Sequence, residues 1–128
     1  MLKILTIDDS RVMRQMLHAT LSGAGHTAIQ AADGQEGLET LSDAGHVDLI
    51  ITDINMPRLD GFGFIEKARE LPAHRATPIL VLSTESSDEK KARARTAGAS
   101  GWIVKPFNSE TLLRAVRRVN GGGDFGPA

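Results

Sequence analysis

One pattern dominates the sequence: short apolar runs alternate with longer stretches whose apolar residues are spaced as in a helix. Four of the runs are strongly apolar and one is weaker. Continuously apolar runs, as opposed to runs that alternate with polar residues, are typical of strands covered on both faces of a parallel sheet. We therefore expect five parallel strands, at Ile4–Ile7, Thr27–Ile29 (the weaker run), Leu49–Thr52, Ile79–Leu82 and Trp102–Val104.

Each run is followed by a stretch that predicts an α-helix. In the first stretch, Ser10 is a suitable N-cap, and Gly23 and Gly25 are typical of a helix end. Five successive strand–helix units with right-handed connections indicate an α/β fold, a doubly wound parallel sheet with helices on both faces. The other four helices are expected at about Gly34–Ala44, Gly61–Leu71, Asp88–Ala97 and Ser109–Val119.

The length and composition fit one globular domain. The chain has 128 residues, of which 41% are hydrophobic and 24% are charged. We expect one domain over residues 1–120, followed by a disordered Gly-rich tail at residues 121–128. The absence of cysteine excludes disulfides, zinc–thiolate sites and thiol nucleophiles. No apolar run approaches the ~20 residues of a membrane span, and acids follow the first run directly, so a cytoplasmic protein without membrane insertion is expected.

Charge is unevenly distributed along the chain. The formal net charge of −1 argues against non-specific nucleic-acid binding, and no nucleic-acid partner is expected. Acidic residues predominate up to residue 62, whereas basic residues predominate between residues 88 and 118. This asymmetry fits an acidic site in the first half and a basic flank in the second. A solvated helix face is the simpler interpretation of the basic flank taken alone.

Reactive side chains follow four of the five apolar runs. Asp8 and Asp9 come after the first run, Asp53 after the third, Ser83 and Thr84 after the fourth, and Lys105 after the fifth. In a doubly wound sheet, sites form at the carboxyl ends of the strands. We therefore expect three carboxylates, a hydroxyl and an ammonium group to gather at one edge of the sheet.

This set of groups is suited to phosphoryl transfer. Three neighbouring carboxylates repel one another, and an all-oxygen ligand set favours a hard cation such as Mg²⁺. A carboxylate beside the metal can act as a nucleophile and form an aspartyl phosphate. Lys105 would supply a positive charge for the phosphoryl oxygens, and the Ser83 hydroxyl would hydrogen-bond the new group.

Each element of the site also has a structural explanation. Asp8-Asp9-Ser10 is typical of a helix start, Asp53 of a turn and Lys105-Pro106 of a surface turn, and Ser83-Thr84 is suited to capping the next helix. Only the phosphoryl site, however, requires all of them at the same edge. We therefore favour it.

The chain resembles the CheY-like receiver family of response regulators over roughly Leu2 to Val119. The resemblance implies a flavodoxin- and CheY-like sheet with strand order 2-1-3-4-5. It also implies a phosphoacceptor switch, with autophosphorylation from small phosphodonors and autodephosphorylation, in place of an enzyme that turns over a substrate. The matching motifs are Asp8-Asp9-Ser10, Asp53-Ile54-Asn55-Met56-Pro57, Asp60-Gly61, Ser83, Ala97-Gly98-Ala99 and Lys105-Pro106-Phe107.

The resemblance also assigns the metal site. Asp53 would be the phosphoacceptor. Asp9 and Asp53 would bind Mg²⁺ directly, Asp8 would act largely through water, and the backbone carbonyl of Asn55 would complete the protein ligands.

The remaining roles concern switching and phosphoryl loss. Ser83 would be the switch hydroxyl and Lys105 the phosphoryl-binding group, with a cis Lys105-Pro106 peptide. Trp102 stands at the position of the switch aromatic, although anchoring the fifth strand is almost as good an interpretation. Asn55 and Glu85 occupy the positions that tune dephosphorylation, and their pairing resembles chemotaxis CheY proteins, which implies quick autodephosphorylation.

By the same resemblance, a histidine kinase would be the phosphodonor, and the output would be protein–protein contact by a monomer. The flagellar switch or a phosphorelay protein is an expected target, and a phosphate sink is an alternative role. The four histidines are expected at or near the surface. The output face would comprise the fourth helix, fifth strand and fifth helix, with Lys90, Lys91, Arg95, Trp102, Arg114 and Arg118 as contact residues.

Two other classes of protein fit the sequence less well. A haloacid-dehalogenase-type phosphatase also uses an aspartate nucleophile, but it needs a second acid two residues later, where this chain has Asn55. A nucleotide-binding module needs a Gly-rich loop between the first strand and helix, where this chain has Asp8-Asp9-Ser10-Arg11.

Overall fold

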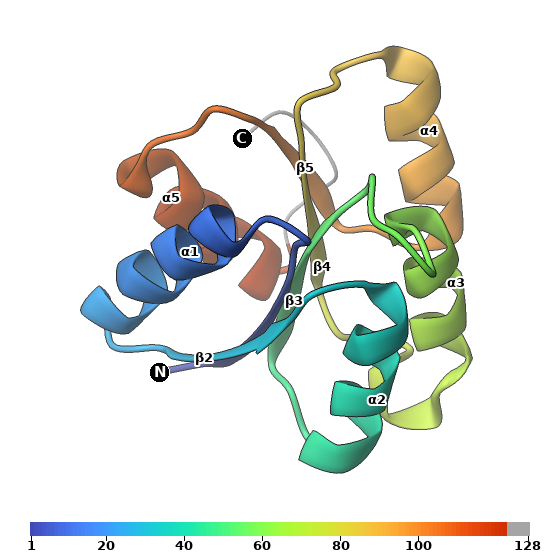
Figure 1. Cartoon of the computed structure of the whole chain (residues 1–128), viewed down its shortest axis with the longest axis horizontal. Coiled ribbons are helices and arrows are strands. Elements are labelled where there is room, and N and C mark those ends of the chain that lie inside the picture. The colour runs from blue at the N-terminus through green and yellow to red at the C-terminus, as the bar shows by residue number, and fades with distance from the viewer. Residues whose placement is uncertain (123–128) are drawn as a thin grey trace.

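The computed structural model describes residues 1–122 and confirms the α/β architecture (Figure 1). Its parallel sheet has the order β2-β1-β3-β4-β5. The strands are β1 (Lys3–Ile7), β2 (Thr27–Ala31), β3 (Leu49–Asp53), β4 (Ile79–Ser83) and β5 (Gly101–Val104). The helices are α1 (Arg11–Gly23), α2 (Gly34–Ala44), α3 (Gly61–Glu70), α4 (Asp88–Ala97) and α5 (Ser109–Asn120), with a short 3₁₀ helix, η1, at Pro72–His74.

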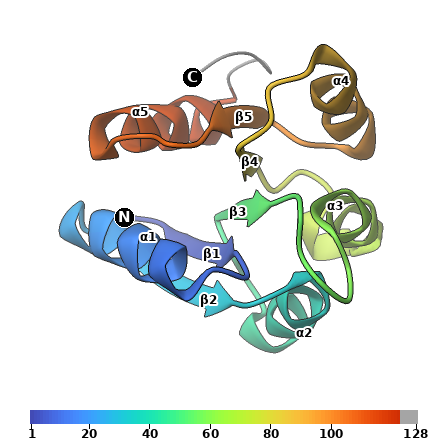
Figure 2. The ribbon, with the colours of Figure 1, turned by 45° about the horizontal axis from the view of Figure 1, so that its top comes forward.

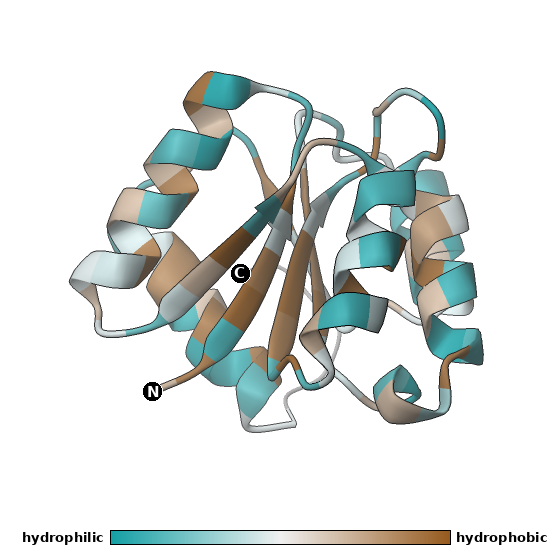
Figure 3. Cartoon of the chain, turned by 60° about the horizontal axis from the view of Figure 1, so that its bottom comes forward, coloured by the Kyte–Doolittle hydropathy of each residue, from teal (hydrophilic) through white to brown (hydrophobic). Residues whose placement is uncertain are grey.

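The sheet separates two hydrophobic layers. Figure 2 shows α1 and α5 on one face of the sheet and α2, α3 and α4 on the other. Neighbouring strand residues alternate between the layers: Leu5 and Ile7 face the α2–α4 side, whereas Ile4 packs with Leu17 of α1 and Leu112 of α5. The strands are accordingly apolar along most of their length (Figure 3), which explains the continuous apolar runs in the sequence.

Side-chain caps fix where the helices begin. Ser10 accepts a hydrogen bond from the Met13 amide and Asp33 accepts one from the Glu36 amide. Helix α4 is capped by Ser87, whose hydroxyl accepts from the Lys90 amide. The interpretation of Ser83-Thr84 as the cap of this helix is therefore wrong, and the Ser83 hydroxyl is left for another role.

The register brings the ends of the strands to one edge. Ile7 lies beside Thr52, and Asp53 beside Leu82. Ser83, the last residue of β4, lies beside Val104, the last residue of β5. The residues that end or follow these strands therefore lie next to one another, as the chain order predicts.

The structure differs from the sequence-based expectation at one histidine. His74, at the end of η1, is 2% exposed, and its Nδ1 lies 3.1 Å from the Thr77 hydroxyl. His18 and His46 are exposed and His26 is partly buried, as expected. Most of the predicted tail, residues 123–128, lies outside the described residues. Within residues 1–122, no helix combines the length and the apolar character that crossing a bilayer requires.

Candidate functional site

Three carboxylates meet at the carboxyl edge of the sheet. Asp8 and Asp9 follow β1, and Asp53 ends β3; their ligand oxygens all lie within 4.8 Å of one another. Asp8 is 1% exposed and Asp53 is 9% exposed, whereas Asp9 is open to solvent. Backbone amides orient the two buried carboxylates: the Ser10 amide donates to Asp8 Oδ1 at 2.9 Å, and the Ile54 amide to Asp53 Oδ1 at 2.7 Å.

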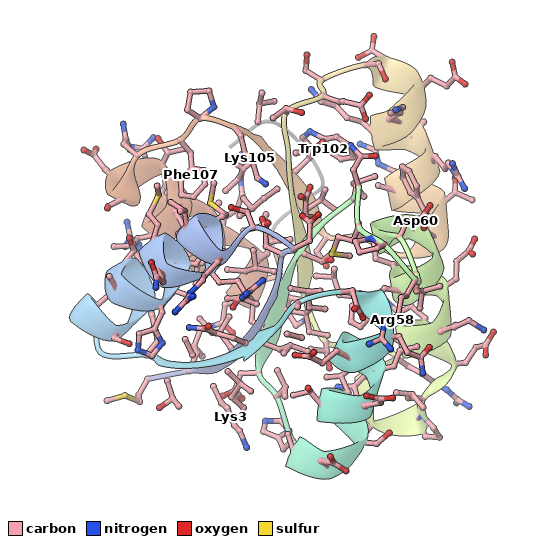
Figure 4. All side chains as sticks on the ribbon, in the orientation of Figure 1. Lys3, Arg58, Asp60, Trp102, Lys105 and Phe107 are labelled. Atoms are coloured by element: carbon pink, nitrogen blue, oxygen red, sulfur yellow. The ribbon has the colours of Figure 1, made fainter. Side chains whose placement is uncertain are left out.

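Lys105 joins two of these acids. Its Nζ lies 2.9 Å from Asp8 Oδ2 and 3.3 Å from Asp53 Oδ2 (Figure 4 labels Lys105 above the strand ends). The Lys105 amide donates to the Ser83 carbonyl at 2.7 Å, which holds the β5–α5 loop against β4. The Lys105-Pro106 peptide is cis, as the resemblance implied.

Burial and charge act against each other in this cluster. Burial raises the pKa of the Asp53 carboxyl above its ordinary value, although Lys105 and the Ile54 amide favour the charged form. For Lys105, burial alone would lower the pKa, but the hydrogen bond to Asp8 and the charges of Asp53 and Asp8 outweigh it and raise the pKa. Lys105 is therefore a firmly protonated cation beside a carboxylate whose ionisation is costly.

The three acids fit a hard divalent cation. Carboxylate oxygens are the ligands that Mg²⁺ prefers, and three of them against one ammonium leave an excess of negative charge. Asp8, Asp9 and Asp53 would hold the ion. Asn55, the proposed donor of a backbone carbonyl, is exposed in the β3–α3 loop, two residues after Asp53.

The residues assigned to switching meet at Glu85. The buried Ser83 hydroxyl accepts from the Glu85 amide at 3.1 Å, and Trp102 Nε1 donates to the Glu85 carbonyl at 2.9 Å. The Glu85 carboxylate pairs with Lys90 of α4 at 2.5 and 2.6 Å. The hydroxyl, the indole and α4 are thus connected through one residue of the β4–α4 loop.

The predicted output face contains one residue that is almost fully buried. Trp102 is 2% exposed, because its ring is turned into the core and its Nε1 is bound to the β4–α4 loop. In this conformation most of Trp102 is packed in the core, as expected of an anchor for β5, and only a small part of it lines a groove on this face. Arg95, Arg114 and Arg118 are exposed, and Lys90 and Lys91 are partly exposed.

Several supporting contacts were not predicted from the sequence. Arg14 of α1 donates to the Asp8 carbonyl at 2.6 Å, and Lys90 pairs with Glu85. Arg58 forms a two-pronged ion pair with Asp33. The Asp33-x-x-Glu36 spacing, an acidic relative of the capping box, was the one available signal for Asp33.

In metal-free protein, Asp53→Asn is expected to increase the free energy of unfolding at pH 7. Because the pKa of Asp53 is raised by folding, ionised Asp53 opposes folding. The destabilisation by ionised Asp53 is absent below the carboxyl's pKa in the unfolded chain, about 3.9, and is fully present above its raised pKa in the folded protein. Thermal unfolding in a chelator should therefore show a Tm gain of a few degrees at neutral pH that shrinks as the pH falls toward 4. A variant no more stable than the wild type at pH 7 would contradict this account.

Known proteins share both the sequence and the fold. The family model described as "Response regulator receiver domain" matches residues 4–117. Protein PilG of Pseudomonas aeruginosa is 35% identical over 91% of this chain and 85% of its own length. A chemotaxis protein CheY homolog of Campylobacter jejuni is 33% identical over 95% of both chains. The crystal structure of chemotaxis protein CheY4 of Vibrio cholerae superimposes with a TM-score of 0.90 at 48% identity, covering 93% of this chain and 98% of that one. The chain therefore belongs to the response regulator receiver family and is a CheY-like receiver domain.

Proposed function

We propose that this receiver domain is a phosphorylation switch of a two-component system, in which Asp53 accepts a phosphoryl group from a histidine kinase. The observation that carries the proposal is the convergence of Asp8, Asp9 and Asp53 with the Lys105 ammonium at one edge of the sheet. Asn55 stands where a phosphatase with an aspartate nucleophile would need its second acid, which favours a switch over that enzyme.

Three side chains have separate roles in the proposed phosphoryl transfer. Asp53 Oδ2 attacks phosphorus, so an O–P bond forms as the N–P bond to the donor histidine breaks and the imidazole keeps the electron pair. Lys105, already 3.3 Å from that oxygen, neutralises charge on the phosphoryl oxygens. Bound Mg²⁺ would supply further positive charge for the same oxygens. The Ser83 hydroxyl, which accepts from the Glu85 amide, would turn to donate its proton to a phosphoryl oxygen, and the loss of the amide contact would loosen the β4–α4 loop.

Acetyl phosphate tests this function directly. With Mg²⁺ present, intact mass should show one added phosphoryl group, and Asp53→Asn should show none, because it lacks the nucleophile. Replacing Mg²⁺ with a chelator should also abolish the adduct. An unmodified wild type that still binds Mg²⁺ would contradict the proposal and indicate an interaction domain that works without phosphorylation.

The lifetime of the adduct tests the roles of Asn55 and Glu85. Because this pairing resembles that of CheY proteins, we expect the phosphoryl group to be lost quickly after removal of the donor. In the resting structure the Glu85 carboxylate is bound to Lys90, so a Lys90→Ala variant frees it and should change the rate of loss. Rapid loss fits a chemotaxis-type regulator or a phosphate sink, and slow loss would favour a longer-lived signal.

The kinase is proposed to dock on α1. This helix begins at Arg11, two residues after Asp9, and it exposes Val12 (70%) and Met16 (44%) about one turn apart. Large apolar side chains at a helix surface beside a reactive group are suited to a transient protein contact.

The target protein is proposed to bind the face formed by α4, β5 and α5. A groove of about 460 Å³ lies on this face. Its apolar side chains suit an apolar anchor of a partner, and Lys91 suits a neighbouring acid. The flagellar switch is one proposed target, because several relatives are named as chemotaxis proteins. The lining residues are Lys91, Trp102, Ile103, Val104, Pro106, Phe107, Asn108 and Thr111.

A further inference from the structure

The β3–α3 loop, residues 54–60, starts at the phosphoacceptor and is closed at its base. The Ile54 amide holds Asp53 Oδ1, and the Ile54 carbonyl accepts from the Gly61 amide at 2.8 Å. Asn55 follows immediately. A movement of this loop therefore displaces the residues that surround the Asp53 carboxylate.

The far end of the loop is fastened to α2 by an ion pair. Arg58 donates from Nε to Asp33 Oδ2 at 2.9 Å and from Nη2 to Asp33 Oδ1 at 3.2 Å. Asp33 is 8% exposed, and its Oδ1 also accepts from the Glu36 amide at the start of α2. Figure 4 shows Arg58 beside the first turn of this helix. Two parallel hydrogen bonds fix direction as well as distance, which a single contact from a lysine would not do.

A backbone contact lies next to this pair. The Gly34 amide donates to the Leu59 carbonyl at 3.2 Å. A Cβ atom at Gly34 would lie only 2.4 Å from that carbonyl oxygen, so only glycine permits this approach. Two consecutive residues at the start of α2, Asp33-Gly34, therefore contact two consecutive residues of the loop, Arg58-Leu59.

The backbone of Arg58 adopts an unfavourable conformation to make the pair. Its φ of 68° lies in the left-handed region, where it is the one non-glycine residue among residues 1–122. This conformation brings the Cβ atom of an ordinary side chain close to the following carbonyl oxygen, a steric cost that glycine or asparagine largely avoids. Because most exposed ion pairs contribute little stability, the strained backbone points to a role in positioning the loop.

We propose that Arg58 and Asp33 form a clamp that holds the β3–α3 loop in the conformation that binds the divalent cation, so that Arg58 is a positioning residue for the Asp53 site. The proposal rests on the proposed function for the identity of the cation. Without the clamp, the loop samples more conformations, and part of the binding free energy of Mg²⁺ is used to order Asn55 and its neighbours.

The clamp is tested by a double-mutant cycle on Mg²⁺ affinity. Arg58→Asn removes the guanidinium but keeps a residue that tolerates a positive φ, and Asp33→Asn removes the charge but keeps an oxygen for the α2 cap. Calorimetric titration of the full chain with MgCl₂ should give a dissociation constant raised roughly three- to tenfold in each single variant. The double variant should be no weaker than either single variant, and Arg58→Lys should recover only part of the loss.

A control breaks another side-chain contact of an aspartate. His46→Ala removes the pair with Asp48 at the opposite edge of the sheet and should leave Mg²⁺ affinity unchanged. Unchanged affinity in the Arg58 and Asp33 variants, with only a lower Tm, would overturn the clamp and leave a structural ion pair. Additive losses in the double variant would also overturn it. If the wild type binds Mg²⁺ but takes no phosphoryl group, the proposed function fails while the cycle still decides the clamp.

Discussion

Lys105→Met is expected to slow phosphoryl transfer to Asp53 by roughly a hundredfold to a thousandfold. The ammonium group is placed before any phosphoryl group arrives, 2.9 Å from Asp8 Oδ2 and 3.3 Å from Asp53 Oδ2, and its side chain is only 12% exposed. A charge fixed in such a dry position stabilises the transition state without reorganising solvent. Methionine has a similar length and keeps the packing, so the loss is electrostatic.

The same variant should bind Mg²⁺ more tightly. Lys105 neutralises part of the charge of Asp8 and Asp53, and a bound cation must share these carboxylates with it. Removing the ammonium leaves an Asp8 that is 1% exposed without its cationic partner. We therefore expect the free energy of unfolding of the metal-free variant to be about 3 kcal/mol lower than that of the wild type, and Mg²⁺ to restore most of it. The Mg²⁺ dissociation constant of the variant should be roughly three- to tenfold lower.

This prediction is specific because the same substitution should slow phosphoryl transfer and yet strengthen Mg²⁺ binding. Phosphoryl transfer is followed by intact mass with acetyl phosphate at saturating Mg²⁺, and affinity by calorimetry. Lys105→Arg keeps the positive charge, so its Mg²⁺ affinity should stay near that of the wild type. Its rate of phosphoryl transfer then shows whether the position of the side-chain cation matters as well as its charge. Weaker Mg²⁺ binding by Lys105→Met would mean that Lys105 organises the loop more than it competes for the carboxylates.

Most of the fold could be predicted from the sequence, because its signals are local. Burial on both faces makes β3 and β4 continuously apolar, and the N-cap and terminal glycines mark α1. Even the weak run at Thr27–Ile29 is a strand, β2, which extends to Ala31 because β1 pairs with it along its whole length. The strand order came from the resemblance and is confirmed.

The errors arise from the path of short loops, at Ser83 and His74, and from contacts between distant segments, at Trp102 and Arg58. Ser83 does not cap α4, because it lies four positions before the N-cap Ser87, and the loop between them turns its hydroxyl toward the Glu85 amide. His74 and Trp102 are polar-tipped rings whose burial depends on partners, Thr77 and Glu85, that no periodicity reveals. The Arg58–Asp33 pair joins residues 25 positions apart and has no sequence signature beyond the Asp33 cap.

Gly61→Ala is expected to damage the site and the fold together. A Cβ atom at Gly61 would lie 2.3 Å from the Asp53 carbonyl oxygen and 2.8 Å from Ile54 Cα, both of them backbone atoms. Neither can turn away as the end of a side chain can. Either the hydrogen bond from the Gly61 amide to Ile54 is lost, or the end of β3 shifts and takes the Asp53 carboxylate with it. We expect a loss of roughly 3 kcal/mol or more in the free energy of unfolding and a Mg²⁺ affinity lowered roughly tenfold.

Gly63→Ala is the matched control, two residues further along the same helix. There a Cβ atom would lie 2.7 Å from Leu59 Cδ1, the far end of a flexible side chain that can rotate aside. Alanine also favours the helix by up to about 1 kcal/mol over glycine, so this variant should unfold at the wild-type temperature or above and bind Mg²⁺ normally. Urea unfolding and calorimetry of the two variants show whether the loss in Gly61→Ala comes from the close approach of α3 to β3 or from replacing a glycine in this helix. If Gly61→Ala matches Gly63→Ala in both measurements, α3 does not need to touch the phosphoacceptor strand, and Asp53 must be held in place by Lys105 and the Ile54 amide alone.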